Sequence, residues 1–141
     1  MKTLKSMVAG IALLLACITA NAAVKSHATQ PTQKDVVNIY INAIANGKTD
    51  NLDKVLGDDL QFNMQRGQRV NTLTKDQLLN YLKNNTVSGE SVDTATTVLS
   101  DDENTSKIKI DFKYNGYTRT DVVTLDKSFG WKITSVNSSS K

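Results

Sequence analysis

Apolar residues recur with the spacing of a helix in the first half of the chain and with the alternation of a strand in the second half. The first helix is predicted to begin at Thr32, an N-cap residue followed three positions later by Asp35, and to end at Gly47, which suits a left-handed C-terminal position. Residues three and four positions apart share one face of a helix. The apolar residues that do so here are Val36, Val37, Tyr40, Ile41 and Ile44.

Two further helices are predicted before the alternation takes over. A short one has Asp50 as its cap and Leu52, Val55 and Leu56 as its apolar side, and residues 57–59 break it. A longer one begins at Thr74, which forms a capping box with Gln77. Its core-facing residues are predicted to be Leu78, Leu79 and Leu82, joined by Tyr81.

Strict alternation of apolar and polar residues predicts the strands. Residues 60–64 form a half-buried strand, which turns at 66–68 into a short return strand around Val70. From residue 91 onward the period is two, with strands expected at 92–99, 108–114, 117–125 and 129–133. Three helices followed by an antiparallel meander predict an α+β fold with the helices on one face of the sheet.

The dipeptide Asn115-Gly116 is a strong signal for a two-residue hairpin turn. Because residues paired directly across such a hairpin share a face, Arg119 and Asp121 are expected on the apolar face of the sheet. The predicted pairs are Tyr114 with Tyr117, Phe112 with Arg119, Ile110 with Asp121, and Ile108 with Val123.

The N-terminus has the pattern of a secretory signal peptide. A basic start is followed by a short apolar run at 7–19 and then by Ala20-Asn21-Ala22, an A-x-A cleavage site. We expect cleavage after Ala22, a linker at 23–31, a domain at 32–137, a polar tail at 138–141 and a periplasmic or secreted location. The segment before Cys17 loosely resembles a lipoprotein box, and acylation of Cys17 would tether the domain to a membrane instead.

Composition narrows the chemistry further. The whole chain has a formal net charge of +3, which falls to +1 once Lys2 and Lys5 leave with the signal peptide. The other basic residues are scattered, which argues against nucleic-acid binding. The one histidine, His27, lies in the linker, so neither a catalytic triad nor a histidine metal site is expected.

Several short motifs recur in the order found in one known superfamily. They are Tyr40-Ile41-Asn42-Ala43-Ile44-Ala45-Asn46-Gly47, Asp58-Asp59-Leu60-Gln61-Phe62, the helix from Thr74 to Leu82, and Gly130-Trp131-Lys132-Ile133. Together they resemble the NTF2-like superfamily, which includes SnoaL-like, ketosteroid-isomerase-like and cystatin-like proteins, and most of all its small exported members, the group called putative lumazine-binding proteins. The resemblance implies a curved sheet wrapped around helices to form a conical pocket.

The resemblance to ketosteroid isomerases of this fold implies roles for three residues. Tyr40 is similar to their oxyanion-donating tyrosine, and Asp121 approximates the position of their protonated aspartic acid. The position of their general base is occupied by Met64, and a thioether cannot abstract a proton. This departure favours a non-catalytic protein; the alternative is an isomerase, cyclase or lyase that uses Asp121 and Tyr40.

An apolar cone with a few convergent polar groups suits a small amphiphilic ligand. Two other interpretations of Arg119 and Asp121 stay open: a solvated surface ion pair at the end of the sheet, or a one-residue bulge that turns both outward. The candidate pocket residues are Tyr40, Ile44, Phe62, Met64, Phe112, Arg119, Asp121 and Trp131.

The sequence therefore favours an exported, non-catalytic module that binds a small ligand in its cone or a protein partner. No cofactor and no metal are expected. Family resemblance implies a homodimer through the outer sheet face, although that face equally suits plain solvent surface. A structural subunit of a larger exported assembly is a third class that the residues leave open. The outer face is predicted to carry Lys109, Asp111, Lys113, Thr118, Thr120 and Thr124.

Overall fold

The computed structural model describes residues 29–85, 91–128 and 130–141, and its domain spans Pro31–Lys141. The signal peptide expected at 1–22 and residue 129 of the last predicted strand lie outside the described residues. Within the described part of the chain, no helix has the length and apolarity needed to cross a membrane. The elements in chain order are α2 (Gln33–Asn46), α3 (Leu52–Val55), β1 (Leu56–Arg66), β2 (Arg69–Leu73), α4 (Lys75–Asn84), β3 (Asp93–Asp101), β4 (Thr105–Tyr114), β5 (Tyr117–Lys127) and β6 (Trp131–Ser140).

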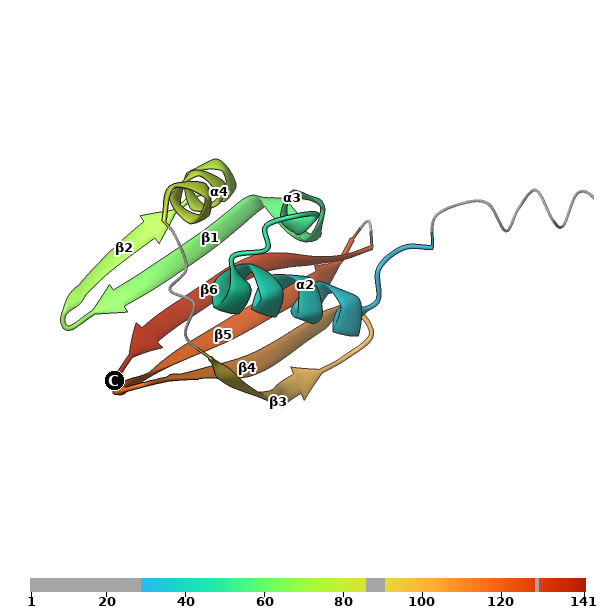
Figure 1. Cartoon of the computed structure of the whole chain (residues 1–141). Helices are drawn as coiled ribbons and strands as arrows, with labels where there is room; N and C mark the ends of the chain where they lie inside the picture. The colour runs from blue at the N-terminus through green and yellow to red at the C-terminus, as the bar shows by residue number, and fades with distance from the viewer. Residues whose placement is uncertain (1–28, 86–90, 129) are drawn as a thin grey trace, which may run out of the picture. The chain divides into compact units, whose positions relative to one another are not determined.

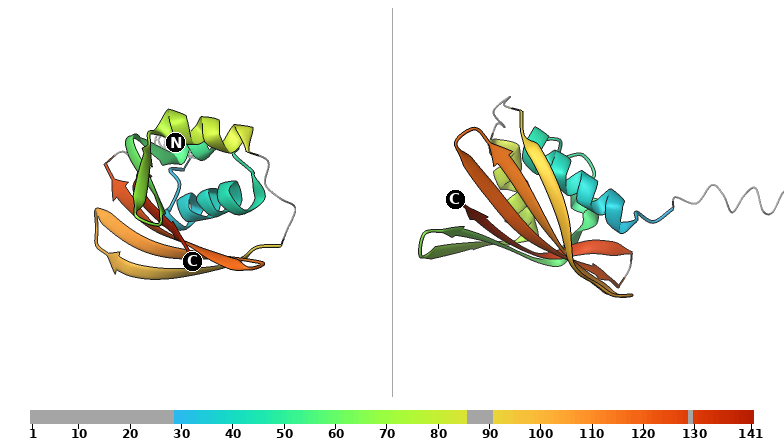
Figure 2. Two further views of the ribbon diagram at one scale, coloured as in Figure 1. Left: turned by 90° about the vertical axis from the view of Figure 1, so that its left-hand side faces the viewer. Right: turned by 90° about the horizontal axis from the view of Figure 1, so that it is seen from below.

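The strands form one six-stranded sheet in the order β2-β1-β6-β5-β4-β3. Figures 1 and 2 show this sheet curving around α2, with the helices on its inner face. The α+β class with three helices on a curved sheet is therefore confirmed. One detail is corrected: β1 and β6 run parallel, whereas all other neighbouring strands are antiparallel. Strand β6 thus joins the N-terminal hairpin to the C-terminal meander.

Both predicted capping boxes are present. The backbone N–H of Asp35 donates to Thr32 Oγ1 at 3.3 Å, and the backbone N–H of Thr74 donates to Gln77 Oε1 at 3.0 Å. Gly47 ends α2 with φ at 68°, the left-handed conformation expected of it. The side chains of Thr32 and Gln77 thereby accept hydrogen bonds from N–H groups that the helices themselves leave without partners.

Three local predictions are wrong. The N-cap of α3 is Asn51 and not Asp50, because Asn51 adopts the left-handed backbone with φ at 64° that turns the chain into the helix. The short helix does end before residue 57, but residues 57–59 already belong to β1, which begins at Leu56 with an irregularity before Gln61, so the strand starts four residues earlier than predicted. Tyr81 does not join the core, since 37% of its surface is exposed.

The C-terminal segment differs most from its prediction. Residues 138–141 were expected to form a polar tail, yet Ser138 to Ser140 complete β6, where Ser140 pairs with Arg119 and Ser138 with Asp121. Backbone hydrogen bonds to strands on both sides explain this result, because they do not depend on the polarity of the side chains. The serines thereby extend the inner face of the sheet past the end of the apolar core.

The core lies between α2 and the inner face of the central strands. Tyr40, Phe62, Phe112 and Ile133 are almost completely buried there, and each such side chain contributes about 1.5–3 kcal/mol of hydrophobic stabilisation. The hairpin register is the predicted one, with Phe112 opposite Arg119 and Ile110 opposite Asp121. The charged side chains of Arg119 and Asp121 therefore lie on the apolar inner face of the sheet.

Candidate functional site

A buried hydrogen-bond network crosses the interior from helix α2 to strand β5. Tyr40 Oη donates to Asp121 Oδ2 at 2.6 Å. Arg119 donates to the same carboxylate through Nε and Nη2, both at 2.9 Å, in a bidentate ion pair. Tyr40 and Asp121 are fully buried, while the Arg119 side chain keeps 19% of its surface exposed. Arg119 and Asp121 thus form neither a solvated surface pair nor an outward bulge.

Aromatic rings hold Arg119 in place. Its guanidinium carbon lies 5.8 Å from the ring centroid of Phe62 on β1 and 5.8 Å from that of Phe112 on β4. Both separations lie within the range of a cation–π interaction. The rings and the bidentate carboxylate leave the guanidinium little freedom to rotate.

Burial and the charges within this network set the protonation states of Tyr40 and Arg119. Burial, reinforced by the charge of Asp121, raises the pKa of Tyr40 well above its usual value, so Tyr40 remains a hydrogen-bond donor. Burial alone would lower the pKa of Arg119, but Tyr40 and Asp121 outweigh that effect and raise this pKa above its usual value. Arg119 is therefore a permanent cation inside the domain.

A cavity of about 180 Å³ opens beside Arg119, at the end of the inner face where the β4–β5 hairpin turns. One turn of α4 and the ends of four strands surround it. Its wall is mixed, with aromatic, thioether, hydroxyl and cationic groups. The lining residues are Met64, Gln65, Arg66, Tyr81, Tyr114, Tyr117, Arg119, Ser138 and Ser140.

One edge of the Arg119 guanidinium has no acceptor among the described residues. Arginine has five N–H groups, and two of them are used by Asp121. Among the described residues, no buried side-chain nitrogen lacks a partner. The Nη1 atom has no acceptor among the described residues, and Arg119, whose side chain keeps 19% of its surface exposed, lines the cavity.

The structure brings five of the eight predicted pocket residues together around a sixth, Arg119. Asp121, Tyr40 and the two phenylalanines are buried behind or beside Arg119 and do not line the cavity, whereas Met64 lines it together with Arg119. Ile44 lies in the core on the face of α2 that carries Tyr40. Trp131 is remote: it pairs with Lys127, eight residues along β5 from Arg119, or about 26 Å at the rise of a strand.

Sequence reasoning did not include several residues that line the cavity. Tyr114 and Tyr117 stack with ring centroids 4.7 Å apart and an angle of 9° between the rings. Their pairing was predicted from the hairpin, and that register already placed them on the face of Arg119. No local pattern indicated Arg66, Ser138 or Ser140, because they converge only through the pairing of β1 with β6, and Tyr81 joins them from α4, which contacts β1.

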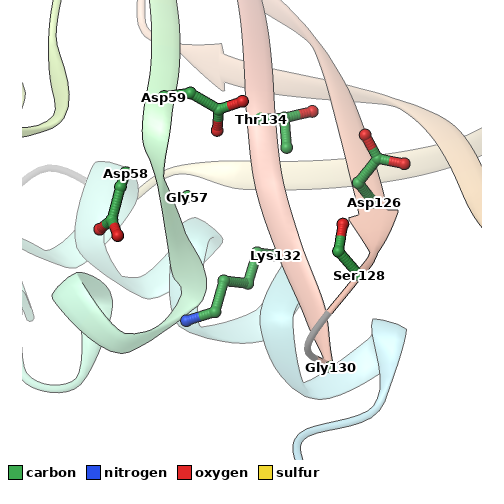
Figure 3. A pocket seen from close by; sticks show the side chains of 8 residues that line it. All are labelled: Gly57, Asp58, Asp59, Asp126, Ser128, Gly130, Lys132 and Thr134. Carbon is green, nitrogen blue, oxygen red and sulfur yellow. The ribbon is translucent and has the colours of Figure 1, made fainter.

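A second hollow of about 300 Å³ lies near the opposite end of the sheet (Figure 3). It is larger, but its charged groups do not converge. Asp58 points away from Asp126 in Figure 3, and its exposed carboxylate pairs with Lys75 at 3.3 Å. Lys132 donates to the backbone carbonyl of Lys54 at 2.9 Å. No group of three acidic, histidine or cysteine side chains suited to a metal occurs among the described residues.

The fold and site define an NTF2-like domain, and solved structures of this class are similar to the chain. An NTF2-like protein of unknown function from Silicibacter pomeroyi DSS-3 has a TM-score of 0.61 at 15% identity, over 75% of this chain and 90% of that one. A cystatin-like fold protein from Burkholderia xenovorans LB400 has a TM-score of 0.61 at 11% identity, over 75% and 86%. A "putative ketosteroid isomerase" from Parabacteroides distasonis ATCC 8503 has a TM-score of 0.57 at 12% identity, over 81% and 91%.

At these identities the similarity establishes the fold alone. The family is established by sequence: a family model described as "Putative lumazine-binding" matches residues 28–137. The chain belongs to this family. No curated protein matches the chain.

Proposed function

We propose that this chain is an exported, non-catalytic domain that binds a small amphiphilic ligand. The ligand lies in the cavity beside Arg119, which forms the cone mouth. The observation that carries the proposal is the partly exposed Arg119 side chain at a cavity whose other walls combine three tyrosines and Met64 with a few polar groups. Pockets that combine apolar walls with a few placed polar groups are the usual form of small-molecule sites. The N-terminal signal pattern supports export.

The family description supports the same ligand class. Lumazine is a planar heterocycle whose carbonyl groups accept hydrogen bonds. Arg119 offers donors to such a group, and the stacked rings of Tyr114 and Tyr117 offer a flat aromatic neighbour. At about 180 Å³ the cavity is smaller than the usual range of about 300–1,000 Å³, so we expect it to hold one end of the ligand.

The hydrogen bonds of Asp121 favour binding over catalysis. The carboxylate accepts three hydrogen bonds from Tyr40 and Arg119 and is fully buried. A general acid or base must reach the reacting proton directly or through one water. Asp121 is fully buried and does not line the cavity, which Arg119 does, and Met64 is the residue that the resemblance aligns with the isomerase base.

The test is native mass spectrometry of the full chain exported from a bacterial host, with and without added lumazine. We expect a discrete added mass that harsher activation removes. Replacing Ser140 with Trp should block the cavity and abolish the added mass. Ser139→Trp is the matched control, because Ser139 is the next residue of β6 and faces the opposite side of the sheet. Bare protein in both preparations would contradict ligand binding, and an unprocessed mass would contradict export.

A protein partner is the second candidate, favoured by strand β3. All nine residues of this edge strand are exposed, including Val98 and Leu99 at 62% and 52%. Exposed edges with apolar residues pair readily with another strand. Binding of a partner there, or homodimerisation through the outer face, would appear in the same spectra as a doubled or discrete protein mass.

A further inference from the structure

The arginines of this chain gather at one end of the fold. The sequence has three, and two of them, Arg66 and Arg119, line the cavity at the cone mouth. The third, Arg69, lies directly opposite Arg66 across the β1–β2 hairpin. Like charges that face each other on paired strands are destabilising. In the described part of the chain neither Arg66 nor Arg69 forms an ion pair.

Among the described residues that line the cavity, no carboxylate side chain balances this charge. The described part of the lining has two arginines and neither an aspartate nor a glutamate. Asp121 lies behind Arg119, completely buried, and both of its oxygens already accept hydrogen bonds. The hollow at the other end of the sheet has the opposite character, with three aspartates and one lysine. A ligand at the cone mouth therefore meets a positive site.

The lining groups and the volume of the cavity restrict which anions can bind there. The guanidinium edge that remains free is planar and suits two oxygens side by side, as in a carboxylate. Tyr81, Tyr114 and Tyr117 supply aromatic neighbours, and Met64 supplies a thioether that contacts rings favourably. A volume of about 180 Å³ is enough for a single substituted ring and too small for a drug-sized ligand.

From these observations we infer that the cone mouth selects a small aromatic carboxylate. The carboxylate lies on the free edge of Arg119, Arg66 adds charge at the rim, and the ring lies along the tyrosines. This inference rests on the proposed function and specifies its ligand class. It predicts preference for the anion over a neutral isostere and for an aromatic acid over a bare anion.

The three arginines make a direct experiment feasible. The full chain, labelled with ¹⁵N-arginine, is titrated with sodium benzoate while the side-chain Nε–Hε signals are followed. We expect the Arg119 signal to shift, and benzamide to bind about tenfold or more weakly because it lacks the charge-assisted hydrogen bonds. Acetate and inorganic phosphate should also bind more weakly, since they lack the ring.

Two exposed positions supply matched variants. Arg66→Gln should weaken benzoate about two- to fivefold, the effect of one solvent-exposed charge. Arg69→Gln removes the same charge from a residue that does not line the cavity and should change the affinity less. Arg119→Gln should abolish binding. Because that variant can also unfold, the test relies on comparing Arg66→Gln with Arg69→Gln.

The outcomes separate the inference from the proposed function. Equal affinity for benzoate and benzamide, equal effects of phosphate and benzoate, or equal effects of the Arg66 and Arg69 variants would overturn the anion site. An added mass in the native spectra together with no benzoate shift would overturn only the ligand class. No shift and no added mass would overturn both.

Discussion

Two ion pairs on adjacent strands share one sequence spacing and differ in almost everything else. Lys109 and Asp111 are two residues apart on β4, and Arg119 and Asp121 are two residues apart on β5. The first pair faces the outside of the sheet, with a single contact of 3.5 Å and side chains 41% and 23% exposed. The second faces the core, with two bonds of 2.9 Å and side chains 19% and 0% exposed.

The difference shows how burial decides what a charge pair does. An exposed pair gains little because water already solvates both ions and screens their attraction. A buried pair is costly to desolvate, but once formed it cannot lose one member without leaving the other unpaired. The outer pair is therefore expendable, whereas the inner pair fixes the position of a cation beside a cavity.

The largest expected effect comes from removing Asp121. Asp121→Ala leaves the buried Arg119 cation and the Tyr40 hydroxyl without their acceptor, and we expect a loss of about 3–5 kcal/mol in the free energy of unfolding. Urea denaturation at neutral pH measures it. Asp111→Ala is the matched control on the outer face, and a loss of equal size there would contradict the distinction between the pairs.

Tyr40→Phe should have an intermediate effect. It removes the 2.6 Å hydrogen bond to Asp121 but leaves the ion pair with Arg119. A hydrogen bond to a charged group contributes about 1.5–3 kcal/mol, and we expect a loss in that range. Tyr81→Phe, at an exposed tyrosine, should change stability by less than about 0.5 kcal/mol.

The contribution of Tyr40 to the free energy of unfolding should also decrease at alkaline pH. Burial raises the pKa of Tyr40 in the folded state, so the unfolded chain loses this proton first. The stabilisation is fully present below the unfolded value of about 10 and is lost as pH rises through the folded pKa. The stability difference between wild type and Tyr40→Phe should therefore stay constant from about pH 8 to about pH 10 and be smaller at about pH 11. A difference that stays constant up to about pH 11 would contradict the assignment.

The smallest effect is expected from Lys109→Met. The outer pair is half exposed, and Asp111 keeps a 2.6 Å hydrogen bond from Thr120 that helps to lower the pKa of Asp111. We expect a change of about 0–1 kcal/mol in the free energy of unfolding, which added salt should reduce further. A loss as large as that of Asp121→Ala would contradict the comparison.

What could be predicted from the sequence depends on how local the interaction is. The capping boxes at Thr32 and Thr74 and the Asn115-Gly116 hairpin are formed by residues a few positions apart, and all three were predicted correctly. The hairpin register alone placed Arg119 and Asp121 on the inner face. Their burial, however, depends on α2, which lies some eighty residues earlier in the chain.

The cone mouth could not be predicted for the same reason. It forms where β6 pairs in parallel with β1, and Ser138 and Ser140 join that strand through backbone hydrogen bonds although their side chains are polar. Trp131 shows the reverse error: an aromatic residue near the C-terminus suited a pocket by composition, but the sheet places it at the other end from Arg119.

The most direct test of the account is hydrogen exchange of the three arginine Nε–Hε groups in the free protein, measured by NMR. We predict that Arg119 exchanges about tenfold or more slowly than Arg66 and Arg69, because a charge-assisted hydrogen bond to Asp121 must open first. Asp121→Asn should remove most of that protection. Equal exchange at all three arginines would mean that Asp121 does not hold Arg119, and the site proposed at the cone mouth would lose its fixed cation.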